Sequence, residues 1–149
     1  MSAFVLDCSV TATWLFPDQG TPETEALLDR LRSEGALVPG IWHLEIGNVL
    51  VRAERMKRIA KAKVATYLHL LRRLAIVTDT ETDERALRET LLLARECSLS
   101  TYDAAYLELA MRRGVQLATL DRALIRAARY MQVETVPKTS LRVHEKPHE

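Results

Sequence analysis

AFVLDCS, at residues 3–9, places four apolar residues directly before an acidic residue near the start of the chain. Four more short apolar runs follow, at residues 36–38, 75–77, 115–118 and 133–136. Runs of this length are typical of buried strands. Because segments with helical periodicity separate the runs, the sequence predicts an alternating α/β fold with a mainly parallel sheet.

Segments with the periodicity of helices cover residues 10–16, 22–33, 42–58, 61–73, 83–97, 101–112 and 122–131. Gly114 is placed to end the sixth of them. Two segments have an apolar face that indicates how they pack. The residues expected to point inward are Ile46, Val49, Leu50 and Ala53 in one, and Tyr102, Ala105, Tyr106 and Leu109 in the other. Glu45 shares a separate, polar face with Asn48 and Arg52, and Asp103 also lies off its apolar face.

Length and composition are those of an ordinary globular protein. The chain has 149 residues, of which 48% are hydrophobic and 28% charged, with a net charge of +1. A chain of this length buries roughly 70% of its unfolded surface, so we expect one domain over residues 1–137. Apolar content falls beyond Pro137, which predicts a C-terminal tail over 138–149.

The two cysteines indicate the compartment. Cys8 and Cys97 lie far apart and match neither a disulfide pattern nor a paired zinc motif. Reduced thiols in a cytoplasm are therefore expected. The sequence shows no secretion signal and no window that would span a membrane, so no membrane partner is expected.

Four acidic residues each have a structural explanation when taken singly. Asp7 ends a strand, and Asp121 precedes a helical pattern as an N-cap does. Asp103 fits a capping box with Ser100, and Glu45 favours the positive end of its helix dipole. Each residue is thus compatible with a purely structural role.

Taken together, three of these acids point to a shared site. Asp7, Glu45 and Asp121 each follow a strand or stand in the first turns of the next helix. In an open parallel sheet these positions meet at one edge, where ligands usually bind. Asp103 is not placed by this argument, because two predicted helices separate the third and fourth strands.

Carboxylates that converge repel one another and favour a bound cation. Oxygen ligands without a nearby histidine or cysteine indicate a hard ion, Mg²⁺ or Mn²⁺. The hydroxyls of Ser9 and Thr119 stand two residues from Asp7 and Asp121, where they can orient a carboxylate or act simply as turn hydroxyls. His43, His69, His144 and His148 form no metal-binding set.

Four short segments resemble the PIN-domain family in order and spacing. They are Val5-Leu6-Asp7-Cys8-Ser9, Glu45-Ile46-Gly47-Asn48-Val49-Leu50, Thr101-Tyr102-Asp103-Ala104-Ala105-Tyr106-Leu107 and Thr119-Leu120-Asp121. More narrowly, the compact length and the third and fourth segments resemble VapC-type toxins of prokaryotic toxin–antitoxin pairs. The likeness extends from residue 3 to about residue 136.

The resemblance implies a three-layer fold with a central parallel five-stranded sheet flanked by helices. It also implies that Asp103 joins Asp7, Glu45 and Asp121 in one cleft, that Ser9 and Thr119 support it, that the chain forms a homodimer, and that a cognate antitoxin blocks the site. The resulting hypothesis is a metal-dependent endoribonuclease. All four acids would hold Mg²⁺ or Mn²⁺, with Asp7 and Asp121 as direct ligands.

A basic segment offers a contact for the RNA backbone. Lys and Arg residues are dense between Arg52 and Arg73, and Glu54 is the only acidic residue among them. Arg52, Arg55 and Arg58 are the residues we expect to hold RNA phosphates, although a solvated helix end gives the same pattern.

Other functions are less compatible with the sequence. A phosphatase with Asp7 as nucleophile would need a second aspartate where Ser9 stands. The scattered glycines form no phosphate loop, and no serine lies in a nucleophile elbow. A non-catalytic metal-binding α/β module, similar to a receiver domain, remains open. Glu45 and Asp103 argue against it, because a regulatory ion site needs fewer acids.

Overall fold

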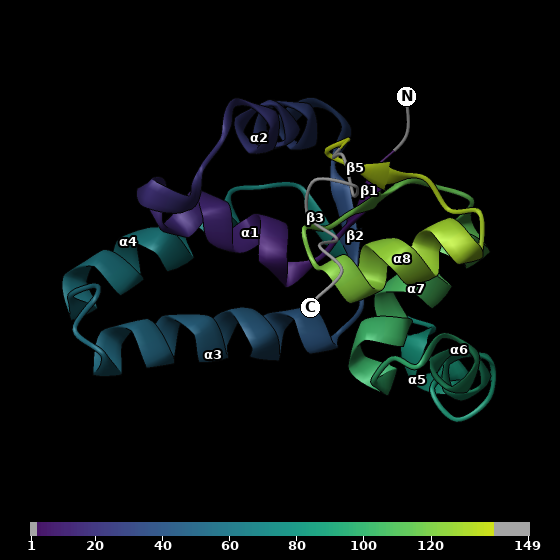
Figure 1. Cartoon of the computed structure of the whole chain (residues 1–149). Helices are drawn as coiled ribbons and strands as arrows, with labels where there is room; N and C mark the ends of the chain where they lie inside the picture. Colours follow the sequence, from purple (N-terminus) through teal and green to yellow (C-terminus); the bar gives the residue numbers. More distant parts are fainter. Residues whose placement is uncertain (1–2, 139–149) are drawn as a thin grey trace, which may run out of the picture.

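The computed structural model describes residues 3–138 and has a central parallel sheet between two helical layers (Figure 1). The strands are β1 (Phe4–Leu6), β2 (Ala36–Val38), β3 (Ile76–Thr78), β4 (Leu117–Ala118) and β5 (Thr135–Val136). The helices are α1 (Cys8–Leu15), the 3₁₀ turn η1 (Pro17–Gln19), α2 (Pro22–Glu34), α3 (Ile41–Arg55), α4 (Lys61–Arg72), α5 (Thr82–Arg85), α6 (Glu89–Cys97), α7 (Thr101–Arg113) and α8 (Arg122–Tyr130).

All strand pairs are parallel, and the order across the sheet is β3-β2-β1-β4-β5. The chain builds outward from β1 to β3, then returns to the other side of β1 for β4. Right-handed crossovers place α1 to α4 on one face and α5 to α8 on the other, as Figure 1 shows. The predicted five-stranded α/β fold is thus confirmed, and the strand order reverses between β1 and β4.

Local sequence signals explain several helix boundaries. Thr21 and Thr24 form a reciprocal capping box at the start of α2, and Pro22 occupies its first turn. Gly114 adopts a φ of 65° after α7, and its amide bonds to the Met111 carbonyl at 3.3 Å. The prediction that Gly114 ends this helix is confirmed.

Helix α3 ends earlier than the predicted residue 58. Lys57 takes a left-handed φ of 59°, and the Arg58 amide donates to the Ala53 carbonyl at 2.8 Å. This pattern closes a helix in the way that glycine usually does. Because a lysine stands at the left-handed position, the sequence carries no stop signal there.

The predicted helix over 83–97 is also wrong, because it is interrupted between α5 and α6. Arg88 has φ −124° and ψ −100°, outside the helical region. The Thr82 hydroxyl ties α5 to Asp79 at 2.7 Å, whereas Leu93 and Ala94 of α6 are buried on the side where α6 packs against α7. Helices α5 and α6 contact different parts of the molecule, so they do not form one straight helix.

Helix α7 is the most enclosed helix of the described chain. All its residues from Ala104 to Ala110 are buried, and it packs against β1 and β4. The predicted apolar face is correct for Ala105, Tyr106 and Leu109. It is wrong for Tyr102, which is 61% exposed because it belongs to the first turn, before the buried part of the helix begins.

The remaining predictions on organisation lie partly outside the described chain. Residues 139–149 of the predicted tail are not among the described residues. Cys8 and Cys97 are both free thiols. Among the described residues, no helix is long and apolar enough to cross a membrane.

Candidate functional site

The site is built around Asp7, which follows the central strand and caps α1. Its Oδ1 accepts the Cys8 amide at 2.8 Å, and the side chain is only 6% exposed. The Asp7 amide bonds to the Ala118 carbonyl of β4 at 2.9 Å. The carboxylate is therefore held where the strand order reverses, which is the usual ligand position in open α/β sheets.

Two hydroxyl groups fix the second oxygen of Asp7. Ser9 Oγ and Thr119 Oγ1 each donate to Asp7 Oδ2 at 2.7 Å. Ser9 Oγ also accepts the Leu120 amide at 2.9 Å, and Thr119 Oγ1 accepts the Asp121 amide at 3.1 Å. The predicted supporting positions of Ser9 and Thr119 thus correspond to contacts that join the start of α1 to the loop after β4.

Glu45 reaches the site from α3 and is held from the opposite helical layer. The Tyr106 hydroxyl donates to Glu45 Oε1. Tyr106 is fully buried in α7. The sequence placed Tyr106 in the core but gave no sign of this bond, because the two residues are 61 positions apart. The contact fixes one oxygen of Glu45.

The last two acids stand at helix starts, as predicted. Asp121 caps α8 by accepting the Leu124 amide at 2.9 Å. Ser100 caps α7 by accepting the Asp103 amide at 3.1 Å, which leaves the Asp103 carboxylate half-buried beside the other acids. Asp121 thus combines a capping role with the shared location, whereas only the Ser100 half of the predicted capping box forms and Asp103 contributes its backbone amide alone.

Electrostatic coupling shows that the four acids form one group, here called the acidic centre. Burial raises the pKa of Asp7 and outweighs its hydrogen bonds, and Asp121 raises it further. Burial and repulsion from Asp7 and Asp103 raise the pKa of Glu45. Burial and repulsion from Asp121 and Asp7 raise the pKa of Asp103. Asp7, Asp103 and Asp121 thus each make ionisation of another acid less favourable.

The chemistry of the acidic centre fits a hard divalent cation. All its donors are carboxylate oxygens, and a cation would relieve their mutual repulsion. Burial, Asp7 and Glu45 raise the pKa of the Cys8 thiol to about 12, so Cys8 offers no thiolate. In the part of the chain described, no three acidic, histidine or cysteine side chains are close enough to hold an ion without adjustment.

A second carboxylate cluster was not foreseen from the sequence. Asp79 follows β3 as Asp7 follows β1, but Arg112 of α7 donates to both its oxygens, at 3.1 and 2.8 Å. Arg112 also pairs with the buried Glu108 at 2.8 Å. This trio, the Arg112 cluster, holds the pKa of Asp79 at about 2, mainly through the Arg112 hydrogen bonds.

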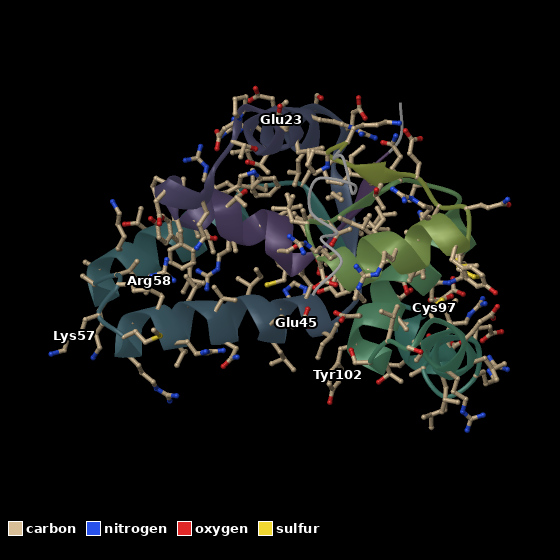
Figure 2. The ribbon with its side chains drawn as sticks, viewed as in Figure 1. Glu23, Glu45, Lys57, Arg58, Cys97 and Tyr102 are labelled. Atoms are coloured by element: carbon tan, nitrogen blue, oxygen red, sulfur yellow. The ribbon has the colours of Figure 1, made fainter. Side chains whose placement is uncertain are left out.

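The predicted RNA-contacting arginines lie away from the acids. Arg52 and Arg55 are exposed on α3, about 10 and 15 Å along its axis from Glu45. Arg58 follows the helix, and its guanidinium lies 4.7 Å from the centre of the Phe16 ring. Figure 2 shows Arg58 and Lys57 at the opposite end of α3 from Glu45. The basic residues thus extend outward from the site.

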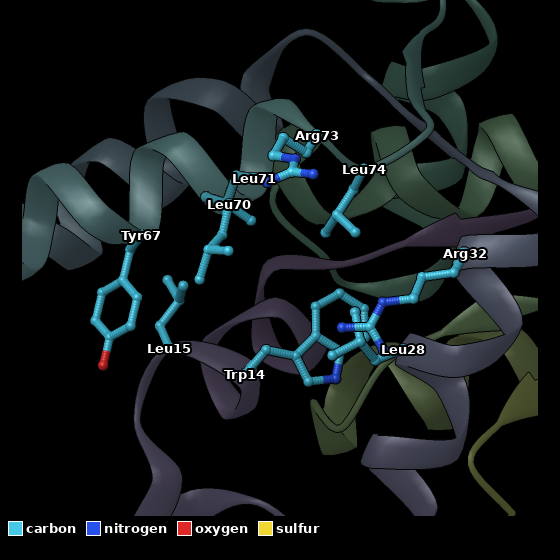
Figure 3. A pocket seen from close by; sticks show the side chains of 9 residues that line it. All are labelled: Trp14, Leu15, Leu28, Arg32, Tyr67, Leu70, Leu71, Arg73 and Leu74. Atoms are coloured by element: carbon cyan, nitrogen blue, oxygen red, sulfur yellow. The ribbon is translucent and has the colours of Figure 1, made fainter.

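An apolar cavity of about 390 Å³ lies between α1, α2 and α4 (Figure 3). Trp14 and Leu15 contribute from the end of α1 opposite to Asp7, Leu28 from α2, and Tyr67 and Leu70 from α4. Arg32 and Arg73 are the charged residues of the lining, and no acid of the acidic centre takes part. The cavity is separate from the acidic centre.

Comparison with known families identifies one match. The family described as the PIN domain matches residues 4–130, which include all four acids, Ser9 and Thr119. No curated protein sequence gives a significant match.

Two crystal structures have a similar fold. PAE2754 from Pyrobaculum aerophilum is 23% identical, with a TM-score of 0.63 over 85% of this chain and 84% of that one. FitAcB from Neisseria gonorrhoeae is 18% identical, with a TM-score of 0.51 over 89% of this chain and 95% of that one. At these identities the two structures bear on the fold alone.

Proposed function

The chain belongs to the PIN-domain family, whose members are generally nucleases, and we propose that it is a metal-dependent endoribonuclease. The observation that carries the proposal is the acidic centre itself. Four carboxylates lie where the strand order reverses, and three of them have raised pKa values. The buried Arg112 lies in the same domain, but it pairs with Asp79 and Glu108 and not with these acids. Clusters of acids with perturbed pKa values are common at functional sites.

Asp7 and Asp121 are proposed as the direct ligands, with Glu45 and Asp103 completing the set. Two hydroxyls hold Asp7, and a backbone amide holds Asp121. A bound Mg²⁺ or Mn²⁺ would offset the charge of the phosphate and lower the pKa of a water molecule. These hydrogen bonds orient Asp7 and Asp121, and binding of an ion would draw the acids closer together.

The reaction is hydrolysis of a phosphodiester bond. A water oxygen attacks phosphorus, the bond to the leaving oxygen breaks, and the leaving group takes up a proton. Glu45 or Asp103 would accept the proton that the water loses, because a raised pKa improves a carboxylate as a base. The Tyr106 hydroxyl would keep Glu45 oriented for this role.

The RNA backbone is proposed to follow the exposed side of α3. Glu45, Asn48, Arg52 and Arg55 lie within about 80° of one another around the helix axis, so a strand leaving the acidic centre meets Arg52 and Arg55 in turn. Charge reversal at both arginines should weaken RNA binding and flatten its salt dependence. An unchanged salt slope would remove them from the proposal. Arg58 is the weakest candidate, since its guanidinium already lies over Phe16.

The proposed setting is a VapC-type toxin of a toxin–antitoxin pair, with residues 1–137 as one nuclease domain. The cavity between α1, α2 and α4 supports an antitoxin partner, because an apolar helix with acidic side chains would complement its leucines and its two arginines. A homodimer is also proposed, as the resemblance to VapC-type toxins implies. Co-purification with the product of a neighbouring short gene, lost on Leu28→Asp, would test the antitoxin surface.

The decisive experiment is cleavage of labelled cellular RNA by the purified chain. The assay compares Mg²⁺, Mn²⁺, a chelator and the Asp7→Asn variant. Cleavage that requires the ion and Asp7 supports the proposal. A protein that binds the ion but cleaves no RNA would instead be the non-catalytic module that the sequence left open.

A further inference from the structure

Tyr102 is an exposed aromatic residue beside the acidic centre. It stands in the first turn of α7, directly before Asp103, and is 61% exposed. Figure 2 shows it projecting from the start of α7 close to Glu45 at the start of α3. The Tyr106 hydroxyl, one turn further along α7, donates to Glu45, so the N-terminal part of α7 adjoins α3 at the acidic centre. A tyrosine ring this exposed leaves a large apolar face in water, where a ligand gains by covering it.

We propose that Tyr102 stacks on an unpaired base of the substrate, next to the phosphate that lies at the acidic centre. The inference rests on the proposed nuclease function and deepens it by naming a residue of this chain that would bind the substrate beside the reacting phosphate. Tyr102 is then a binding residue that selects strand state rather than sequence, because every base has a face on which an aromatic ring can stack.

The charge of the site explains why such a contact is needed. Carboxylates repel an RNA backbone, and the nearest predicted phosphate contact, Arg52, is about 10 Å along α3 from Glu45. Affinity close to the reacting phosphate must therefore come from an uncharged contact or from a cation. The neutral ring of Tyr102, adjacent to Asp103, supplies an uncharged contact and adds no negative charge.

The geometry also selects against a duplex. In a paired helix both faces of each base are covered by their neighbours, so no face is free for Tyr102. A base in a loop or a single strand can turn out and stack. The stacked base would belong to a nucleotide close to the reacting phosphate, because Tyr102 lies one helical turn before Tyr106, whose hydroxyl donates to Glu45.

The chain offers a matched control. Tyr130 is similarly exposed, at 67%, but it is the last residue of α8, whose first turn follows Asp121. Eight helical residues lie between Tyr130 and Asp121, and the two are roughly 13 Å apart along the helix axis. Tyr130 thus matches Tyr102 in chemistry and exposure, and differs in position.

The test measures RNA binding by fluorescence anisotropy in an Asp7→Asn background, which is expected to prevent cleavage. The probes are a mixed-sequence RNA of about 12 nucleotides and the same strand annealed to its complement. We expect Tyr102→Ala to weaken binding of the single strand about 5- to 100-fold and to leave the duplex unchanged. Tyr102→Phe should restore the affinity, and Tyr130→Ala should have no effect. With Asp7 intact, Tyr102→Ala should raise KM more than it lowers kcat.

Three results would overturn the inference. They are single-strand binding by Tyr102→Ala equal to that of its parent, an equal loss for the duplex, and a shift to a smaller species on size-exclusion chromatography, which would make Tyr102 a contact between protein chains. Failure of the proposed function is distinguishable. If the wild-type chain cleaves no RNA, that function falls, while the anisotropy series still decides whether Tyr102 binds unpaired RNA.

Discussion

Two groups of carboxylates in this protein show opposite electrostatics. In the acidic centre, burial and mutual repulsion raise the pKa of Asp7, Glu45 and Asp103. In the Arg112 cluster, hydrogen bonds from the guanidinium lower the pKa of Asp79 to about 2. Asp7 and Asp79 both follow a strand of the same sheet, so position alone does not separate them. We infer from this difference that an acid whose charge is offset by a cationic side chain stabilises the fold, whereas a group of acids without such a partner can bind a cation.

The largest contrast should come from removing one acid of each group. Asp7→Asn should lower RNA cleavage about 1000-fold, corresponding to several kcal/mol of lost transition-state stabilisation, and leave the melting temperature nearly unchanged. Asp79→Asn should lower the melting temperature and spare kcat at a temperature where the variant is folded. Matched cleavage and melting measurements decide this. Strong residual cleavage by Asp7→Asn would show that the acidic centre is not needed for cleavage and that the two groups do not differ in this way.

Removal of Arg112 should test whether its cluster is structural. Arg112→Ala leaves Asp79 and Glu108 buried without their cation, and we expect the free energy of unfolding to fall by about 3 kcal/mol. Arg32→Ala is the control, because the side chain of Arg32 is 60% exposed in its pair with Asp29. Urea denaturation measures both. Similar stabilities for the two variants would show that the Arg112 pairs contribute little.

The two groups should also respond to pH with opposite signs. Asp79 has a lowered pKa, so its contribution to stability is present above the unfolded value of about 4 and is lost as pH falls toward about 2. The acidic centre has raised pKa values, so its protonated form favours folding at low pH, and that contribution is lost as pH rises through the folded pKa values.

A divalent cation should offset this loss. Mn²⁺ should therefore raise the melting temperature more at about pH 7.5 than at about pH 5, because protons compete for the carboxylates at the lower pH. Differential scanning fluorimetry of the wild-type chain and Asp7→Asn provides the comparison. An equal shift in both proteins would place the bound ion elsewhere.

The smallest expected effect concerns the bond between Tyr106 and Glu45. Tyr106→Phe keeps the buried ring but frees Glu45, and we expect the affinity for Mn²⁺ to fall about 10-fold, as for other groups that orient a ligand. Tyr130→Phe serves as the control, since Tyr130 is exposed on α8. Electron paramagnetic resonance titration measures the free ion directly. Wild-type affinity in Tyr106→Phe would show that Glu45 needs no such support.

The sequence by itself determined the elements that local patterns encode. Short apolar runs predicted all five strands, and their spacing from Asp7, Glu45 and Asp121 was enough to place three acids at one edge of the sheet, because parallel strands end together. Gly114 marked the end of α7 for a reason visible in one residue, its tolerance of positive φ.

Only the tertiary structure decided the features that depend on how distant segments pack. The position of Asp103 in the first turn of α7 was readable from the Ser100 cap, but its approach to Asp7 depends on the path of α5 to α7, which no local pattern encodes. The break before α6 and the left-handed Lys57 likewise follow from packing.

The same reason separates the side chains that look alike in sequence. Tyr102 and Tyr106 share one helical spacing, yet one is exposed and the other is buried against Glu45, because α7 enters the core only after its first turn. Asp7 and Asp79 each follow a strand, and only the arrival of Arg112 from α7 gives them opposite electrostatics. Spacing along the chain determines the position of a residue within its helix or strand, and long-range packing determines which residues it contacts.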